Sequence, residues 1–373
     1  MPLSIFIDAL PYTEVKEHYS KWFINQQTAE LQPNIAYSSV LHWQLYCNKY
    51  PDDRLKFVDW QKTPETRKSI RIISCLLRPF DCIRPLSFLN RKVLDRLFFH
   101  GNCFANIPMK FRKDFSEQSQ YLFWNREVYS KEKLFEKYCV VSQDEGNFSF
   151  DETIQKLNNA IESNQKNLFL CIGEIDHQGH LCARGSLYSE IVAKFMAIIR
   201  DSIEKYLNRF PEEEVLIVSD HGMSTINNYV DLKLEKKFGA QSWNNYVAYQ
   251  DSCLMCVWCS DKHKIEDIAE YLKTKEDIGH LLSNGEREYY RTTNPLFGDL
   301  IFNLREGNCF KTSWFGNSIK KHPNGQGMHG FWPDRKAKDQ MAAIILINGK
   351  HSLAPFYTYF DAYNFIKMVM LHE

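Results

Sequence analysis

The sequence predicts an α/β fold in which a mostly parallel central sheet is flanked by helices. Short apolar runs alternate with longer segments of helical period along the 373-residue chain. The runs are almost continuously apolar, which is typical of strands in a sheet covered on both faces. With 44% hydrophobic residues, the chain can also bury a large core.

Four apolar runs are predicted strands, and three segments are predicted helices. The strands are LSIFID (3–8), NLFLCIGEID (167–176), EVLIVSD (214–220) and AAIILING (342–349). The helices are DETIQKLNNAIES (151–163), SLYSEIVAKFMAIIRDSIEKYLNRF (186–210) and FDAYNFIKMVMLHE (360–373). The first two helices precede the second and third strands, as expected for a sheet whose strands are mostly parallel.

Two stretches do not follow this alternation. Residues 66–135 are basic and aromatic, whereas residues 225–330 mix short strands with turns. We expect both to be insertions, or a cap, around one domain that spans residues 1–373.

The charge, cysteine content and hydropathy of the chain indicate which partners it binds and in which cellular compartment it lies. The formal net charge is zero, which argues against binding to a nucleic-acid polymer. The 11 irregularly spaced cysteines indicate reduced thiols and a cytoplasmic location. The opening MPLSIFIDAL has neither the basic region nor the apolar length of a signal peptide, and we expect no transmembrane segment.

Acidic residues stand at the ends of three predicted strands. Asp8 ends the first strand, Glu174 and Asp176 the second, and Asp220 the third. Ligands of open α/β sheets gather beyond the carboxyl ends of the strands. Carboxylates that converge there repel one another and are costly to desolvate, so we expect a cation among them.

Three histidines accompany these acids. His180 follows Asp176 by four residues, a spacing that one helical turn points to the same side. His221 directly follows Asp220, and His329 lies in the glycine-rich stretch NGQGMHG. Mixed nitrogen and oxygen donors favour zinc or manganese over magnesium or calcium. We therefore expect two divalent metal ions, zinc in preference to manganese.

Five motifs occur in a fixed order along the chain. They are IDAL (7–10), YSSVLHWQLY (37–46), DHQGH (176–180), SDHGM (219–223) and GMHG (327–330). Together they resemble the alkaline phosphatase superfamily, in particular its nucleotide pyrophosphatase/phosphodiesterase (type I phosphodiesterase) branch. The resemblance implies an alkaline-phosphatase-like three-layer sandwich with inserted cap segments. It also implies a small-molecule phosphate ester or nucleotide-like substrate.

The family pattern indicates a nucleophile. In that family a Ser or Thr at the start of a helix attacks phosphorus, and a His follows four residues later. Here Ser38 and Ser39 precede His42, and Tyr50-Pro51 stands where the family has Tyr-Pro. This spacing identifies Ser38 as the nucleophile, at a helix N-terminus that favours an anionic phosphate. From the residues alone, an N-cap role for either serine is an equal alternative.

The resemblance also implies how the ligands are divided between two metal sites. One site would contain Asp8, Ser38, Asp220 and His221, and the other Asp176, His180 and His329. In such sites the metals ease ionisation of the nucleophile and of the attacking water. A covalent phosphoseryl or nucleotidyl-seryl intermediate would form on Ser38 and then be hydrolysed.

The chain departs from the diesterase pattern at two places. Leu41 stands where the family has a phosphate-binding Asn, and Cys47-Asn48 replaces Thr-Gly. An arginine from the basic insertion is a candidate to bind the phosphate in place of that Asn. We therefore expect hydrolysis of a phosphodiester or phosphoanhydride bond. Three alternative functions remain: a phosphomonoesterase, a phosphotransferase or mutase of the same superfamily, and a non-catalytic binding protein.

Three further features have structural explanations. Cys253, Cys256 and Cys259 are spaced like a metal cluster, but in a strand Cys256 would face away from the other two, which predicts buried thiols. The aromatic and basic run 98–124 is either the core and rim of an insertion or a surface for the organic half of the substrate. Glu174 either supports the metal ligands or forms a salt bridge.

Overall fold

The computed structural model covers most of the chain outside the first predicted insertion. It describes, besides short pieces between 61 and 129, residues 2–36, 38–50, 131–143, 149–313, 317–318 and 326–372. Most of the stretch 66–135, including most of the run 98–124 and most of the arginines expected as replacements for the family Asn, lies outside the described residues.

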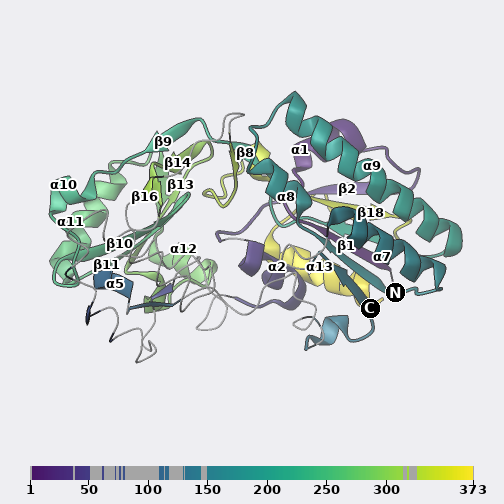
Figure 1. Cartoon of the computed structure of the whole chain (residues 1–373), viewed down its shortest axis with the longest axis horizontal. Helices are drawn as coiled ribbons and strands as arrows, with labels where there is room; N and C mark the ends of the chain where they lie inside the picture. Colours follow the sequence, from purple (N-terminus) through teal and green to yellow (C-terminus); the bar gives the residue numbers. More distant parts are fainter. Residues whose placement is uncertain are drawn as a thin grey trace.

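A seven-stranded sheet is the centre of the larger half of the molecule (Figure 1). Its order is β19-β2-β18-β7-β1-β6-β5. The bounds are β1 Leu3–Ile7, β2 Gln26–Leu31, β5 Cys139–Ser142, β6 Leu168–Ile172, β7 Val215–Val218, β18 Ala342–Ile347 and β19 Phe356–Tyr357. Neighbouring strands are parallel except at β18, which is antiparallel to β7 and β2. The predicted mostly parallel sheet is confirmed, and all four predicted strands belong to it. The second is shorter than predicted, because it ends at Ile172 and the residues expected at its end begin the helix α8 (Glu174–Gly179).

The direction of β18 matters for what lies at the edge of the sheet. Because β18 is antiparallel, it begins at the edge where β1, β6 and β7 end, and the Ser219 amide donates to the Ala343 carbonyl there (2.9 Å). The chain that enters β18, including His329, therefore reaches the carboxyl ends of the parallel strands. The loop after β18 lies at the opposite edge.

Helices cover both faces of the central sheet. On one face, α7 (Phe150–Glu162) and α9 (Ser186–Arg209) pack against alternate strand residues such as Ile5 and Ile217. On the other face, α2 (Ser38–Cys47) and α13 (Tyr359–Leu371) pack against the intervening residues, among them Phe6 and Val218. A capping box of Ser149 and Glu152 begins α7. The result is the predicted three-layer sandwich.

A smaller antiparallel sheet lies beside the sandwich, at the left of Figure 1, in the order β10-β11-β13-β12. The strands are β10 Tyr246–Asp251, β11 Leu254–Cys259, β12 Gly279–Leu281 and β13 Leu300–Leu304. The helices α10 Leu234–Phe238, α11 Lys262–Lys273 and α12 Asn284–Tyr289 belong to the same unit. One face of this sheet packs against α11 in a core of its own, while the other shares a core with α2 and α13.

Two short strands join where this second unit leaves and re-enters the sandwich. β8 (Ser224–Thr225) pairs with β17 (Gly327–Met328). Because this pair brackets residues 225–330, we propose that the second unit is an inserted cap of a single domain. A further pair, β9 (Asn228–Val230) with β14 (Asn308–Phe310), lies within it.

The remaining described elements are short. They are α1 Tyr12–Glu14, the π-helix Val15–Tyr19, β3 Gln61–Lys62, α5 Met109–Arg112, β4 Phe115–Ser116, the 3₁₀ turns Lys133–Phe135, Pro295–Phe297 and Lys338–Gln340, α8 Glu174–Gly179, β15 Thr312–Ser313 and β16 Asn317–Ser318. None of the helices in the described part of the chain combines the length and apolar composition of a membrane span.

The three clustered cysteines behave as their alternation predicts. Cys253 and Cys259 contribute to the core of the cap sheet, whereas Cys256 contributes to the core on its other face. The two faces of β11 thus separate Cys256 from the other two, and all three act as packing residues.

Candidate active site

Asp8, Asp220 and His221 lie together because two neighbouring strands end side by side. β1 ends at Ile7 and β7 ends at Val218, and the two strands are parallel. The acids therefore leave the sheet at the same edge, the expected position for a ligand. The side chains of all three residues are at most 4% exposed.

The backbone around these residues is turned so that its amides hold Asp220. Ala9 adopts a φ of 63°, which is uncommon for a residue with a Cβ atom. Its amide and that of His221 donate to Asp220 Oδ1, at 3.4 and 3.0 Å. The Ser219 hydroxyl accepts from the Leu10 amide (2.8 Å) and donates to the His221 carbonyl (2.8 Å). These bonds orient Asp220 and leave its second oxygen for another partner.

Ser38 is the first residue of α2 and meets this group from the other side. Its hydroxyl lies 2.8 Å from Nε2 of His221 and 3.2 Å from Oδ1 of Asp8, and its single proton can be donated to one of these two acceptors at a time. Nδ1 of His221 faces the Gly222 carbonyl at 2.9 Å, and a carbonyl only accepts. Nδ1 therefore carries the proton, and the lone pair of Nε2 points towards the serine. We name Asp8, Ser38, Asp220 and His221 the strand-end group.

Asp176, His180 and His329 form a second group, which we name the helix–loop group. Asp176 lies in α8 and His180 caps the C-terminal end of that helix. Nε2 of His180 and Nε2 of His329 lie 3.4 Å from the two oxygens of Asp176. Nδ1 of His180 donates to the Gly327 carbonyl at 3.2 Å, which ties α8 to β17. The predicted helical turn between Asp176 and His180 is present.

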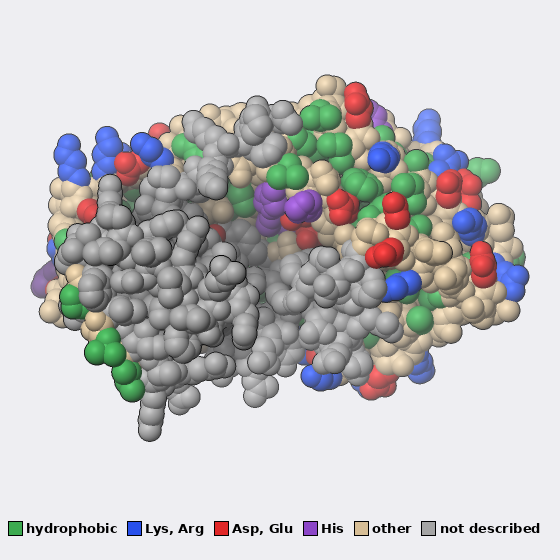
Figure 2. Space-filling view, viewed as in Figure 1, with side chains coloured by type: hydrophobic (Ala, Val, Ile, Leu, Met, Phe, Trp, Pro, Cys, Tyr) green, Lys and Arg blue, Asp and Glu red, His purple; other side chains and the backbone are tan. Residues whose placement is uncertain are grey.

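The two groups form one cluster. Donor atoms of Asp8, Asp176 and His221 lie within 4.8 Å of one another, so Asp176 faces both groups. The rings of His221 and His329 are stacked, with centroids 3.7 Å apart and 6° between their planes. All seven residues expected to bind metal are therefore brought together. Near the middle of the face in Figure 2, histidine and acidic side chains reach the surface together.

The three carboxylates of the cluster perturb one another. Burial, and then the negative charges of Asp220 and Asp176, raise the pKa of Asp8 well above its ordinary value. Burial also raises the pKa of Asp220. Burial alone would raise the pKa of Asp176, but His180 and His329 hold it below its ordinary value. Burial lowers the pKa of His329, which keeps that imidazole neutral and able to donate a lone pair.

This donor set fits divalent metal ions. Within the described residues, Oδ1 of Asp176 and Oδ2 of Asp220 are buried and accept no hydrogen bond. The histidine nitrogens lie 3.3–3.4 Å from carboxylate oxygens. Two ligands about 2.1 Å from a tetrahedral zinc ion would be about 3.4 Å apart. A positive ion would also relieve the repulsion among the three carboxylates.

Two residues next to the predicted site have structural roles. Glu174 accepts hydrogen bonds from the side-chain amides of Gln143 (3.1 Å) and Gln178 (2.8 Å) and so anchors the start of α8. His42 is fully buried among aromatic rings, and its Nε2 lies 3.0 Å from the Tyr129 hydroxyl. His42 therefore belongs to the core behind α2 rather than to the cluster of candidate metal ligands.

Leu41, which stands where the family has a phosphate-binding Asn, is also fully buried and belongs to the apolar core shared by α2 and α13. Its contacts explain why a leucine is stable here. They provide no polar group for a phosphate.

Three supporting residues have no role in the predictions made from the sequence. The Tyr359 hydroxyl at the start of α13 donates to the carbonyl of Asp220. Arg184 donates to the buried Glu14 (2.7 Å), joining the segment after α8 to α1. Ser219, described above, lies inside the SDHGM motif and could have been suspected there. Tyr359 and Arg184 have no comparable local signal, because their partners are distant in sequence.

Comparison with known proteins identifies the family. A sequence profile of the family "type I phosphodiesterase / nucleotide pyrophosphatase" matches residues 93–332, more than half of the 373-residue chain. The matched range contains both motifs that carry Asp176 and Asp220, as well as His329, and begins after Ser38. No curated protein sequence matches the chain significantly.

Solved structures of similar fold cover the whole chain. Human ectonucleotide pyrophosphatase/phosphodiesterase 5 is 12% identical with a TM-score of 0.63, and its murine counterpart is 12% identical with a TM-score of 0.59. An inactive murine form in complex with AMP is 11% identical with a TM-score of 0.58. Each comparison covers 100% of this chain and 95% of the other. At this identity the likeness shows the fold. The profile match across most of the chain, on that fold, shows that this protein belongs to the type I phosphodiesterase/nucleotide pyrophosphatase family.

Proposed function

We propose that the protein is a two-metal hydrolase that cleaves a phosphodiester or phosphoanhydride bond with Ser38 as nucleophile. The observation that carries the proposal is the position of Ser38. Its hydroxyl lies at the N-terminus of α2, 2.8 Å from His221 and 3.2 Å from Asp8, beside a second cluster of metal-ligating side chains. The family and the fold support hydrolysis of this kind of bond.

The chain's own residues account for most of the proposed chemistry. The strand-end and helix–loop groups would hold one divalent ion each, with zinc preferred for the mixed donors. When bound, the ions supply the positive charge that eases ionisation of the serine hydroxyl and of water. The backbone amides of the first turn of α2 would face an anionic phosphate bound near Ser38.

Hydrolysis would then proceed in two displacements. The Ser38 oxygen forms a bond to phosphorus as the bond to the leaving oxygen breaks, which leaves a phosphoseryl or nucleotidyl-seryl enzyme. Water breaks the serine–phosphorus bond in the second step and regenerates the hydroxyl. Burial of Asp8, Asp220 and His221 keeps bulk water away from the serine's inner side.

The proposed substrate is a small phosphate ester or a nucleotide-like molecule. An inactive murine protein of similar fold has been solved in complex with AMP, which supports this class. The net charge of zero supports a small molecule rather than a nucleic-acid polymer.

The proposal is tested by metal analysis and by paired substrates. Metal content is measured by mass spectrometry, and turnover of bis(p-nitrophenyl) phosphate is compared with that of p-nitrophenyl phosphate. Ser38→Ala should lower diesterase kcat by at least about a thousandfold while retaining the metals. Ser20→Ala, at an exposed serine, is the matched control and should be unchanged.

Each alternative function has its own outcome in this experiment. A preference for the monoester would indicate a phosphomonoesterase, and turnover that requires an added alcohol would indicate a phosphotransferase. A protein that binds the ligand without turnover would be a binding protein. Full activity of Ser38→Ala, or activity without bound metal, would exclude the mechanism.

We also propose a cytoplasmic, reducing compartment. The support is the odd number of cysteines, 11, and their irregular spacing. Expression of a full-length fluorescent fusion in its native cell tests this, because fluorescence in the secretory pathway would contradict it.

A further inference from the structure

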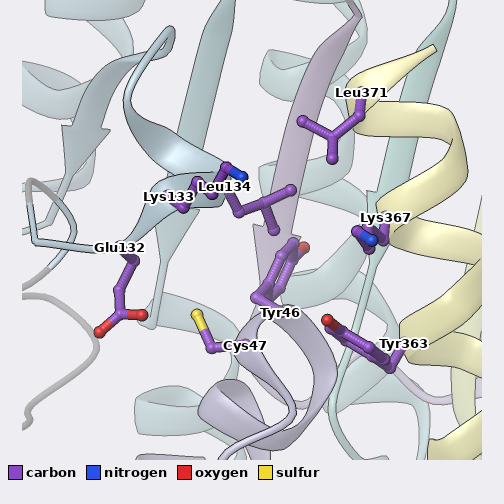
Figure 3. Close-up of a pocket in the computed structure, with 8 residues that line it drawn as sticks. All are labelled: Tyr46, Cys47, Glu132, Lys133, Leu134, Tyr363, Lys367 and Leu371. Carbon is purple, nitrogen blue, oxygen red and sulfur yellow. The ribbon is translucent and has the colours of Figure 1, made fainter. Parts of the chain in front are cut away.

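Two helices on one face of the central sheet, α2 and α13, begin beside the cluster of candidate metal ligands. Ser38 is the first residue of α2, and Tyr359, the first residue of α13, donates its hydroxyl proton to the backbone carbonyl of Asp220. The other ends of the two helices, at Cys47 and Leu371, line a cavity of about 320 Å³ (Figure 3). The helices therefore run in the same direction, and Tyr359 lies at the end of α13 that faces the site.

The carbonyl that Tyr359 contacts belongs to the peptide bond between Asp220 and His221. The amide of the same peptide donates to Oδ1 of Asp220 at 3.0 Å. A backbone carbonyl only accepts, so the tyrosine hydroxyl is the donor in the other bond. Both polar groups of this peptide are therefore held, one by a side chain of α13 and the other by the carboxylate of a candidate metal ligand.

The orientation of this peptide decides where two candidate ligands of the strand-end group lie. Because its amide is bonded to Oδ1, Asp220 keeps Oδ2 as a buried oxygen that accepts no hydrogen bond within the described part of the chain. The side chain of His221 starts from the same peptide, and its Nε2 lies 3.3 Å from Oδ1 of Asp8. Rotation of the peptide would move both ligands.

The contact between Tyr359 and this carbonyl is closed to solvent. Asp220 and His221 are 0% exposed, and Tyr359 is 3% exposed. Bulk water is therefore not in place to bond the carbonyl if the hydroxyl is removed, and the buried acceptor would favour a different orientation of the peptide.

We propose that Tyr359 is a positioning residue that sets the metal affinity of the strand-end group. The inference rests on the proposed function, because it requires that Asp220 and His221 bind a divalent ion. Hydrogen bonds behind metal ligands orient them, and loss of such a bond typically weakens metal binding by about ten- to a hundredfold. The helix–loop group stands on α8 and on the chain that returns from the cap, so its affinity should not depend on this hydroxyl.

Cobalt(II) is the probe, because its visible absorption reports the geometry of a site with nitrogen and oxygen ligands. Two background variants isolate the groups: His180→Ala leaves the strand-end group intact, and His221→Ala leaves the helix–loop group intact. Tyr359→Phe removes only the hydroxyl. In the His180→Ala background it should weaken cobalt binding by at least about tenfold and change the absorption spectrum. In the His221→Ala background it should leave the dissociation constant within about twofold.

Tyr363→Phe is the matched control. It removes a hydroxyl from the same helix, at a tyrosine that lines the cavity in Figure 3 rather than the site. It should leave cobalt affinity unchanged in both backgrounds. A general loosening of α13 would weaken the two groups alike, so the contrast between the backgrounds separates positioning from loss of structure. Circular dichroism confirms that each variant is folded.

Two outcomes would overturn the inference alone. One is a cobalt affinity of the strand-end group that Tyr359→Phe leaves within about twofold, and the other is an equal loss in the two backgrounds. If the protein without substitutions bound no cobalt, the proposed metal centre would fail, and the inference would fail with it. The failure of the inference and the failure of the proposed function are therefore distinguishable.

Discussion

The strand-end and helix–loop groups supply similar ligands but are built differently. Side chains of Asp8, Asp220 and His221 are 4% exposed or less, whereas those of Asp176 and His180 are 19% and 30% exposed. The first group stands on the ends of two paired strands. The second depends on the short helix α8 and on the chain that returns from the cap. The sheet edge thus supplies a buried half of the site, whereas α8 and the chain that returns from the cap supply a half in which Asp176 and His180 are more accessible and His329 is buried.

Because of this difference, the electrostatic repulsion among carboxylates is larger in the strand-end group than in the helix–loop group. The buried carboxylates of the strand-end group repel each other, so their proximity is unfavourable until a cation is present. In the helix–loop group, His180 and His329 already face the charge of Asp176. We expect the strand-end group to dominate the metal dependence of stability, and the helix–loop group to respond more to changes in the cap.

Asp176→Ala should have the largest effect, because Asp176 faces both groups. We expect one metal position to be empty, the other partly filled, and diesterase kcat/KM to fall by at least about a thousandfold. Metal content and kinetics are measured on the same preparation. Glu174→Ala, in the same helix but bonded to glutamines, is the control and should keep both metals. If the Asp176→Ala variant still bound two metal ions, neither group would need Asp176 to bind its ion.

Asp8→Asn should reduce activity by about a hundredfold or more, yet stabilise the metal-free protein. The folded pKa of Asp8 is raised, so the favourable contribution of its protonated form is lost as pH rises through that pKa. At neutral pH the substitution should therefore increase the free energy of unfolding without metal by about 1–3 kcal/mol. With saturating metal the order of stability should reverse.

Urea unfolding with a chelator and with added zinc measures both effects. Asp201→Asn, at an exposed acid of α9, provides the control for loss of a charge. A metal-free Asp8→Asn protein that is less stable than the unmodified chain at neutral pH would contradict the idea of an unfavourable buried charge.

Gly327→Ala should affect the helix–loop group selectively. A Cβ atom at Gly327 would lie 2.3 Å from the Gly179 carbonyl and 2.7 Å from the sulfur of Met223. β17 would have to move away from α8, and His329 would move with it. We expect metal affinity at this group to fall by about tenfold, measured by calorimetric titration. Gly285→Ala, where the added Cβ meets open space, should leave both sites unchanged.

Leu41→Asn should have the smallest effect on catalysis, since it should not raise diesterase activity. The amide would be buried in an apolar core, and we expect a loss of about 2–4 kcal/mol in the free energy of unfolding. Leu41→Met preserves the volume and serves as the control. Increased diesterase turnover in Leu41→Asn would show that a residue at this position does reach the phosphate.

Sequence patterns predicted those pairs of site residues that lie close together along the chain. Asp220 and His221 are adjacent, and Asp176 and His180 are one helical turn apart, so each pair could be recognised from spacing. The packing of strands and helices around the core decided which distant segments meet at the site. The direction of β18 could not be read from AAIILING, because an apolar run that is buried on both faces does not encode which way the strand runs.

The sequence by itself determined the α/β class and the motifs with their candidate metal ligands, and through the family resemblance it indicated Ser38 as the candidate nucleophile. The family resemblance implies that His329 joins Asp176, 153 positions away in the chain, but only the tertiary structure shows their 3.4 Å contact and the hydroxyl of Tyr359 on the carbonyl of Asp220. It also showed that His42 belongs to the core and that α2 ends at a cavity. The reason is physical: spacing along the chain specifies contacts within a turn or at a strand end. Contacts between distant segments depend on how sheets and helices pack.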